Sequence, residues 1–215
     1  MTLRHGAFIA LAACAVYANS LGHGFAYDDV PMVVRNEHIA ESAPWWRPWV
    51  EPYWPGSNEG DVIDLLYRPL TVQTYGLQRR LLGLQPLSFH AVNILLHAGV
   101  SLMLWRVSLR LGLGDGAALA AALLFAVHPI HVEAVANIVG RAEILSALGV
   151  LGAVLAEDAR IRLEGAGAAR TPRYIAWTVL LLLFVAVAVF SKETGAAAVI
   201  VVTGWRLWSS QCGTG

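Results

Sequence analysis

The chain contains a long apolar segment, Tyr174–Phe190, in which no residue is charged. A helix that crosses the hydrocarbon core of a membrane needs roughly 20 mostly apolar residues, each adding about 1.5 Å. Five further apolar segments occur at 6–21, 89–105, 117–127, 144–156 and 194–208. The two shortest segments, 117–127 and 144–156, can span a membrane only together with flanking residues or when buried among other helices. We therefore predict an all-α polytopic membrane protein with about six transmembrane helices.

The composition excludes several other classes of protein. Of the 215 residues, 57% are hydrophobic and 14% are charged, against about 45–50% and about 25% in soluble domains. Disordered chains have low hydrophobicity and high net charge, so this composition excludes a disordered protein. Because 15 basic residues are balanced by 15 acidic ones, there is no basic excess to bind nucleic acid phosphates. Cys14 and Cys212 form neither a metal-binding spacing nor a disulfide framework.

Basic residues at the ends of the apolar segments predict the orientation of the chain. Arginine and lysine concentrate in cytosolic loops, and Arg4 precedes the first segment. With the N-terminus in the cytosol, alternation of the spans places all of these flanking arginines on the cytosolic side. They are Arg4, Arg106, Arg110, Arg160, Arg162, Arg170, Arg173 and Arg206. The segment 22–88 and the loops around 128–143 and 191–193 then lie outside, in a lumen or periplasm.

The first apolar segment has two interpretations. Arg4, the apolar residues after it and the small residues at 18–20 fit a cleaved signal peptide. A polytopic chain does not need such cleavage, and we expect the segment to remain as the first helix.

The predicted outer segment 22–88 is rich in tryptophan and proline. Proline holds the backbone in extended or turn forms, and tryptophan prefers the membrane interface. The rings therefore either anchor the segment at the interface or form a wall for a sugar or peptide substrate, and both interpretations stay open. The residues concerned are Trp45, Trp46, Trp49 and Trp54, with Pro44, Pro48, Pro52 and Pro55 between them.

An amphipathic helix is predicted after this Trp/Pro-rich part, lying along the membrane surface. Its apolar side is expected to consist of Leu70, Val72, Tyr75, Leu77, Leu81 and Leu84, and its polar side of Gln73, Gln78, Arg79 and Arg80.

Two adjacent carboxylates, Asp28 and Asp29, follow the first apolar segment. Adjacent side chains point in different directions, so one carboxylate can face a substrate while the other holds a partner or a metal. A general base must lie within hydrogen-bond reach of the proton that it removes. The alternative is a solvated turn, because aspartate favours turns and helix caps.

A second polar cluster lies at His128, His131 and Glu133. Histidine and carboxylate are common ligands of divalent metals, and ionisable residues at a membrane boundary are candidates for function. The cluster is therefore a candidate metal site or a substrate-binding site. The alternative is the hydrogen-bonded start of a helix after Pro129.

The outer cations form a third group of candidates. Arg68, Arg141 and Lys192 lie next to apolar segments, and Lys192 is the only lysine in the sequence. A lipid phosphate at the membrane surface would need such partners, and arginine makes forked contacts with phosphate. The alternative is that these cations pair with Glu133, Glu143 or Glu193.

Several of these phrases, in this order, resemble the transmembrane and tetratricopeptide repeat-containing family of protein O-mannosyltransferases. The resemblance extends over about 25–195, and its most specific part is the block that contains His131, Glu133 and Arg141. The phrases are FAYDD (25–29), VVRN (33–36), YRPLT (67–71), FHAVNILLH (89–97), HPIHVEAVANIVGRAE (128–143) and SKETG (191–195).

The resemblance implies a C-type glycosyltransferase that takes mannose from dolichyl phosphate mannose and attaches it to Ser or Thr hydroxyls of lumenal, cadherin-like proteins. It assigns catalysis to Asp28 and Asp29, with Asp28 as the base. To this we add Arg68, Arg141 and Lys192 as phosphate contacts, and His131 and Glu133 as substrate-binding or metal-binding residues. In a eukaryotic cell the enzyme is expected in the endoplasmic reticulum membrane.

The expected domains are a transmembrane glycosyltransferase-like part, 1–208, and a short polar tail, 209–215. Family members also carry a tetratricopeptide array, which is absent here, so we expect the chain to be part of a longer enzyme. Three alternatives remain. They are a non-catalytic membrane scaffold, a membrane metalloenzyme built on His128, His131 and Glu133, and a transporter.

Overall fold

The computed structural model describes residues 2–55 and 66–212, and all regular elements in these residues are helices. The α-helices are α1 (Thr2–Tyr17), α2 (Pro69–Leu82), α3 (Pro86–Arg110), α4 (Asp115–Val127), α5 (Val132–Ala136), α6 (Arg141–Gly165), α7 (Pro172–Ser191) and α8 (Ala197–Cys212). Single turns of 3-10 or π type lie at Ala18–Gly22, Val30–Val34, Glu37–Ile39, Arg47–Trp49, Pro129–His131, Ile138–Gly140 and Glu193–Ala196. The predicted outer segment 22–88 includes 56–65, which lie outside the described residues.

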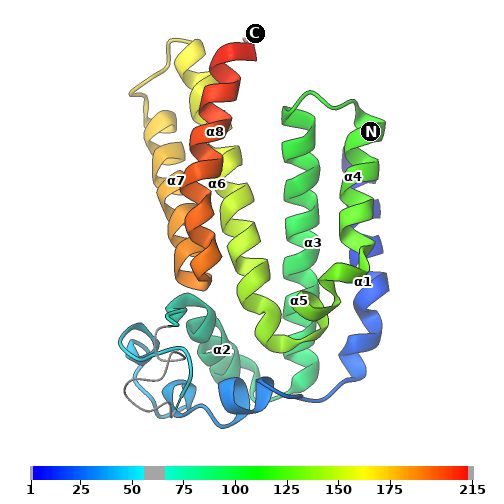
Figure 1. Ribbon diagram of the computed structural model, residues 1–215, viewed down its shortest axis with the longest axis vertical. Helices are drawn as coiled ribbons and strands as arrows, with labels where there is room; N and C mark the ends of the chain where they lie inside the picture. The colour runs from blue at the N-terminus through cyan, green and yellow to red at the C-terminus, as the bar shows by residue number, and fades with distance from the viewer. Residues whose placement is uncertain (1, 56–65, 213–215) are drawn as a thin grey trace.

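The long helices form one bundle whose two ends differ (Figure 1). Helices α1, α3 and α4 pack together on one side, α7 and α8 pack on α6, and α3 packs against α6. One end carries the start of α1 and the end of α8, and the flanking arginines lie on helix ends or loops there. The other end, called the site end below, carries α2, α5 and the loop that joins α7 to α8 (Figure 1). The polar candidates are thus separated from the arginine flanks, as the alternation of spans predicts.

The predicted all-α membrane architecture is confirmed, but the count of six spans is not. Four helical stretches are long and apolar enough to cross a membrane, namely Leu3–Gly22, Pro86–Arg110, Ile138–Gly165 and Pro172–Ser191. A bent pair, Asp115–Val127 with Pro129–Ala136, makes a fifth if it is one span. Helix α8 has 16 residues and thus reaches about 24 Å, short of the roughly 30 Å hydrocarbon core.

The bend between α4 and α5 arises from Pro129. Proline lacks an N–H and disfavours helical geometry in the residue before it, and His128 is extended at φ −67° and ψ 128°. The Nδ1 atom of His128 accepts a hydrogen bond from the Ile130 N–H at 3.1 Å. The chain bends by 44° there, and α5 carries Glu133 to the site end.

Helices α6 and α7 approach each other closely because small residues line their contact. A Cβ atom placed on Gly149 would lie 2.5 Å from the backbone nitrogen of Ala188. Such close approach of helix backbones through glycine and alanine is common in membranes. The contact fixes the end of α7, and hence Lys192 and Glu193, relative to α6.

Gly149→Ala should destabilise the bundle by about 1–3 kcal/mol, because the added methyl group forces the two helices apart. Thermal unfolding in detergent measures the effect. Gly99→Ala on α3 is the matched control, because a Cβ there meets no heavy atom within 4 Å. If both variants unfold at the same temperature, the close α6–α7 contact is wrong.

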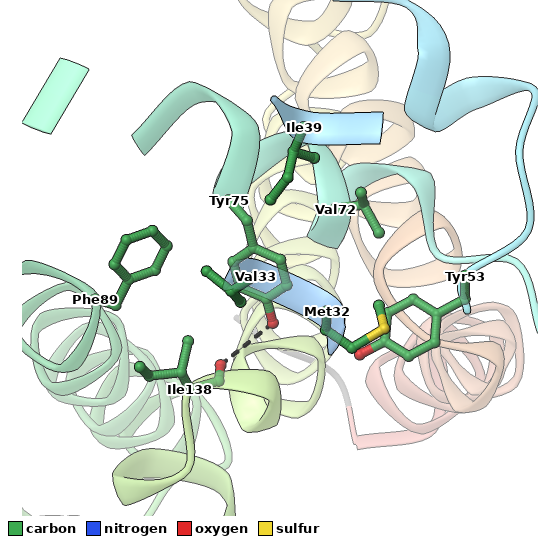
Figure 2. Packing of buried hydrophobic residues seen from close by; sticks show 8 residues of the cluster. All are labelled: Met32, Val33, Ile39, Tyr53, Val72, Tyr75, Phe89 and Ile138. Carbon is green, nitrogen blue, oxygen red and sulfur yellow. Dashed lines mark hydrogen bonds between the residues drawn. The ribbon is translucent and has the colours of Figure 1, made fainter. Parts of the chain in front are cut away.

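A compact apolar cluster holds the site end together (Figure 2). It joins the segment after Asp29, helix α2, the first turn of α3 and the turn before α6. The Tyr75 hydroxyl donates to the Ile138 carbonyl oxygen at 3.2 Å across this cluster (Figure 2). Its members are Met32, Val33, Ile39, Tyr53, Val72, Tyr75, Phe89 and Ile138.

The predicted helix after the Trp/Pro-rich part is confirmed as α2, but its faces differ from the prediction. Gln78 is buried, and its Nε2 donates to the Ser88 Oγ at 3.1 Å. Leu77 and Leu81 are exposed. A further contact, from the Thr71 Oγ1 to the Ser191 carbonyl oxygen at 2.9 Å, ties α2 to the end of α7.

Candidate active site

A cavity of about 420 Å³ opens at the site end, between the segment after α1, the Trp/Pro-rich part and the α5–α6 turn. Four of the residues predicted from the sequence share it: Asp28, Arg68, His131 and Glu133. They come from three separate parts of the chain, because His131 and Glu133 belong to one short segment. The other lining residues are Tyr53, Trp54, Ile130, Ala134, Asn137, Val139, Gly140, Ala142 and Glu143.

The structure gives the two adjacent aspartates different environments. Asp29 is buried, and its carboxylate accepts hydrogen bonds from the Ala26 N–H at 3.1 Å and the Val139 N–H at 3.0 Å. It thus ties the loop after α1 to the turn before α6. Asp28 is exposed and lines the cavity. The structural carboxylate and the cavity-lining carboxylate are therefore adjacent in sequence.

Burial raises the pKa of Asp29, against the two backbone hydrogen bonds, which lower it. Because the folded pKa lies above the unfolded one, the folded protein holds the Asp29 proton more tightly. Ionisation of Asp29 therefore lowers the stability of the fold as the pH rises from the unfolded pKa of this group through its folded pKa.

Arg68 is held in place on the cavity wall by Glu193 and Tyr53. Its Nε donates to the Glu193 Oε1 at 3.0 Å and its Nη2 to the Glu193 Oε2 at 2.8 Å. The guanidinium carbon lies 4.7 Å from the centre of the Tyr53 ring, within the range of a cation–π contact. Burial raises the pKa of Tyr53 to about 12, although the charge of Arg68 opposes that rise. Tyr53 is therefore a neutral wall residue at physiological pH.

Lys192 contacts the site through an ion pair with Glu143, which lines the cavity. Burial and the charge of Arg68 lower the pKa of Lys192. Two of the three candidate cations thus pair with carboxylates in this structure, Arg68 with Glu193 and Lys192 with Glu143. The pairing alternative considered from the sequence is realised for both.

Acid should weaken the contact between Arg68 and Glu193. Burial raises the pKa of Glu193, but the hydrogen bonds and charge of Arg68 outweigh burial, so its pKa is lowered from 4.5. The stabilisation is therefore complete above the unfolded pKa and is lost as the pH falls through the lowered folded pKa. Because the pair is partly exposed, we expect Glu193→Gln to cost about 0.2–1 kcal/mol at pH 7.

The measurement is thermal unfolding of both proteins between pH 7 and pH 3. The difference in melting temperature between wild type and Glu193→Gln should narrow once the pH falls below 4.5, the ordinary pKa from which that of Glu193 is lowered. Glu41→Gln is the control, because Glu41 is an exposed glutamate in the outer segment 22–88, away from Glu193 in the sequence. A gap that stays constant through acid would show that Glu193 acts by packing.

The histidine cluster is divided between the cavity and the protein surface. His131 lines the cavity, and its ring centre lies 4.2 Å from that of Phe125. His128 is exposed and caps the following turn through its side chain. Across 2–55 and 66–212, no three His, Cys, Asp or Glu side chains are grouped so that they could hold a metal ion. The alternative metal set of His128, His131 and Glu133 is therefore not assembled here.

Comparison with known proteins adds a family relationship to this geometry. Protein O-mannosyl-transferase TMTC3 of Mus musculus is 38% identical over 203 residues, which cover 94% of this chain and 21% of that protein. TMTC1 of Homo sapiens is 37% identical over 94% of this chain and 23% of its own length. TMTC4 of Homo sapiens is 35% identical over 85% of this chain and 26% of its own length.

This chain is a relative of the TMTC protein O-mannosyl-transferases. It spans about a fifth to a quarter of the length of the curated relatives that it matches. No family model matches the chain, and no solved structure matches it.

Arg141 lies outside the cavity of this TMTC relative. It is buried, with its Nε donating to the Asn93 Oδ1 at 2.8 Å and its Nη2 to the Phe89 carbonyl oxygen at 3.2 Å. Its guanidinium carbon lies 4.8 Å from the Tyr75 ring centre. Arg141, at the start of α6, thus joins this helix to α3 and α2.

Sequence reasoning missed part of the cavity wall. Asn137 and Tyr53 line the cavity, but neither was singled out. The tryptophans divide between the two interpretations of the Trp/Pro-rich part. Trp54 lines the cavity, whereas Trp45 and Trp46 are exposed. The alternation of proline with tryptophan predicts an aromatic wall, but it does not predict which of the rings lines the cavity.

Proposed function

We propose that this chain is part of a glycosyltransferase that moves mannose from dolichyl phosphate mannose to Ser or Thr hydroxyls of proteins. The observation that carries the proposal is the presence of Asp28 and Arg68 in one cavity at the end of a membrane bundle. The relationship to proteins named protein O-mannosyl-transferases supports it independently.

The chemistry of the cavity fits transfer from a sugar phosphate. Its volume of about 420 Å³ falls within the range of about 300–1,000 Å³ for small-molecule sites. Arg68 provides a forked donor for phosphate oxygens. Lys192 forms an ion pair with Glu143, which is part of the cavity wall. His131 and Glu133 supply polar contacts for sugar hydroxyls.

The reaction needs one base and one leaving group. The Asp28 carboxylate takes the proton of the acceptor hydroxyl. The hydroxyl oxygen forms a bond with the anomeric carbon of mannose, and the bond from that carbon to the phosphate oxygen breaks. The lipid phosphate leaves with the bonding electron pair, and Arg68 stabilises its charge.

The proposal includes an orientation and a cellular location. With the arginine-rich end in the cytosol, the cavity faces the lumen of the endoplasmic reticulum. The lipid tail of the donor then stays in the bilayer while its phosphate reaches the cavity. The proposed acceptor is a lumenal protein of the cadherin-like type that the family resemblance implies.

The test is mannosyl transfer in microsomes that contain either this chain or a version extended to the length of its relatives. Labelled dolichyl phosphate mannose should transfer its label to a cadherin-domain acceptor on the lumenal side. A labelled soluble nucleotide sugar should not label this acceptor when synthesis of the lipid donor is blocked. If neither protein transfers mannose although both insert correctly, the scaffold function replaces the enzyme function.

A further inference from the structure

A second cavity, of about 270 Å³, lies beside the first at the site end. It is formed by the loop after α1, the first turns of α3 and helix α5. Its lining residues are His23, Gly24, Ala26, Tyr27, Asp29, His90, Val132, Glu133, Ala136 and Asn137. The mechanism described above uses none of these residues as a base or phosphate contact.

The two cavities share a wall made by Glu133 and Asn137, which line both. The two aspartates are divided in the same way, because Asp28 lines the first cavity and Asp29 the second. The Glu133 side chain is exposed, so it can move without disturbing a packed core. A group held in the second cavity therefore lies one side chain away from the first.

The second cavity differs from the first in charge and size. Arg68 lines the first, whereas no arginine or lysine occurs among the described residues that line the second. The carboxylate of Asp29 already accepts two backbone hydrogen bonds. With about 270 Å³, the cavity falls below the usual range of about 300–1,000 Å³ for whole small molecules. It therefore suits a small neutral group rather than a sugar phosphate.

His90 provides a buried polar side chain for such a group. It is 1% exposed, and neither ring nitrogen makes a hydrogen bond of normal geometry. Its contacts with the backbone of Gly24 and Ala136 are loose hydrogen bonds, which a better-placed ligand group can replace. A buried polar group without a partner is costly, and each such group calls for an explanation. A ligand hydroxyl can both donate to and accept from an imidazole.

Tyr27 forms the rim of the second cavity in an unusual conformation. Its φ is +45°, and its side chain is 94% exposed. A non-glycine residue with positive φ is uncommon, and such strain concentrates at functional sites. The exposed ring offers a flat apolar surface on which an extended peptide can lie.

We infer that the second cavity is an acceptor site, in which His23, His90 and Tyr27 hold the hydroxyl-bearing side chain of an extended peptide. This inference rests on the proposed function. The first cavity then holds the sugar phosphate, and the hydroxyl reaches the anomeric carbon past Glu133 and Asn137. Asp28 takes the hydroxyl proton once the hydroxyl enters the first cavity, where Glu133 also contacts the sugar.

Two alanines on α5 provide a matched test in the extended protein. Ala136 lines the second cavity and Ala134 the first. We expect Ala136→Leu to raise the KM for the acceptor by about tenfold without changing the KM for the donor, because it removes space for one substrate only. Ala134→Leu should do the reverse. If Ala136→Leu raises the donor KM alone, the assignment of the cavities is wrong.

A second variant guards against loss of folding. A Cβ atom on Gly24 meets no heavy atom within 4 Å, so Gly24→Leu adds a side chain at the second cavity from a position with open space around its Cβ. Its acceptor KM should rise as for Ala136→Leu, with an unchanged melting temperature. An unchanged acceptor KM in a folded Gly24→Leu protein would overturn the inference.

A measurement without turnover separates this inference from the proposed function. A threonine peptide with a diazirine-bearing leucine beside the threonine should label 23–27 and 132–137 in the absence of donor. Labelling should fall in Gly24→Leu and should not be displaced by dolichyl phosphate. If labelling follows this pattern while no protein transfers mannose, the acceptor site stands and the mannosyltransferase proposal fails. Displacement by dolichyl phosphate, or absence of labelling there, overturns the acceptor site.

Discussion

Asp28→Asn is expected to lower the rate of mannosyl transfer by about 10²–10⁴-fold, the usual contribution of a general base. Asparagine has the same shape as aspartate but does not take up the hydroxyl proton. Because Asp28 is exposed and lines the cavity, the substitution should leave folding unchanged. The measurement is the initial rate of transfer from labelled dolichyl phosphate mannose, made in the extended protein together with its melting temperature.

Two further variants make this result interpretable. Asp115→Asn changes an exposed aspartate in the first turn of α4, at the opposite end of the bundle, and should keep full activity. Asp29→Asn should lower the melting temperature, because Asp29 accepts two backbone hydrogen bonds with its two oxygens. If folded Asp28→Asn retains wild-type activity, Asp28 is not the base.

Arg141→Met should produce the largest loss of stability, about 2–6 kcal/mol, because it removes the donor from two buried hydrogen-bond acceptors. The substitution leaves the Asn93 Oδ1 and the Phe89 carbonyl oxygen without their donors. Unpaired buried acceptors cost about 1–3 kcal/mol each. Methionine fills most of the volume, so the loss of the hydrogen bonds accounts for most of the effect.

Thermal or denaturant unfolding in detergent measures this change. Arg173→Met, which removes an exposed arginine at the start of α7, should change the stability by less than about 0.5 kcal/mol. Arg141→Lys tests the geometry, because lysine keeps the charge but cannot make the forked contacts. A loss below about 1 kcal/mol in Arg141→Met would mean that the interior of the site end is not organised around Arg141.

The helical architecture could be predicted because it depends on local patterns. Apolar length predicts spans such as Tyr174–Phe190, and proline at 129 predicts the break that delivers Glu133 to the site end. The flanking arginines predict that Asp28, Arg68 and His131 lie at one end of the bundle. Their presence in one cavity is consistent with that prediction.

The remaining features depend on contacts between distant parts of the chain. Asp28 and Asp29 are identical in type. Asp29 becomes structural through hydrogen bonds from the nearby Ala26 N–H and from the N–H of Val139, 110 positions away. Arg141 is buried because α3 supplies Asn93 and Phe89 as partners. Likewise, Glu157 is buried on α6 because Arg160 and Arg206 neutralise it. Apolar composition does not reveal such partners.

The carboxylates that hold Arg68 and Lys192 have a consequence for which anions can occupy the cavity. Among the described residues, both candidate cations at the cavity are already neutralised, Arg68 by Glu193 and Lys192 by Glu143. An incoming anion must therefore displace one of these carboxylates from its cation. Chloride or a single carboxylate gains little by such an exchange. A phosphate, with several oxygens on one centre, can replace both carboxylates at once. Selectivity by displacement thus favours phosphate over the far more abundant simple anions.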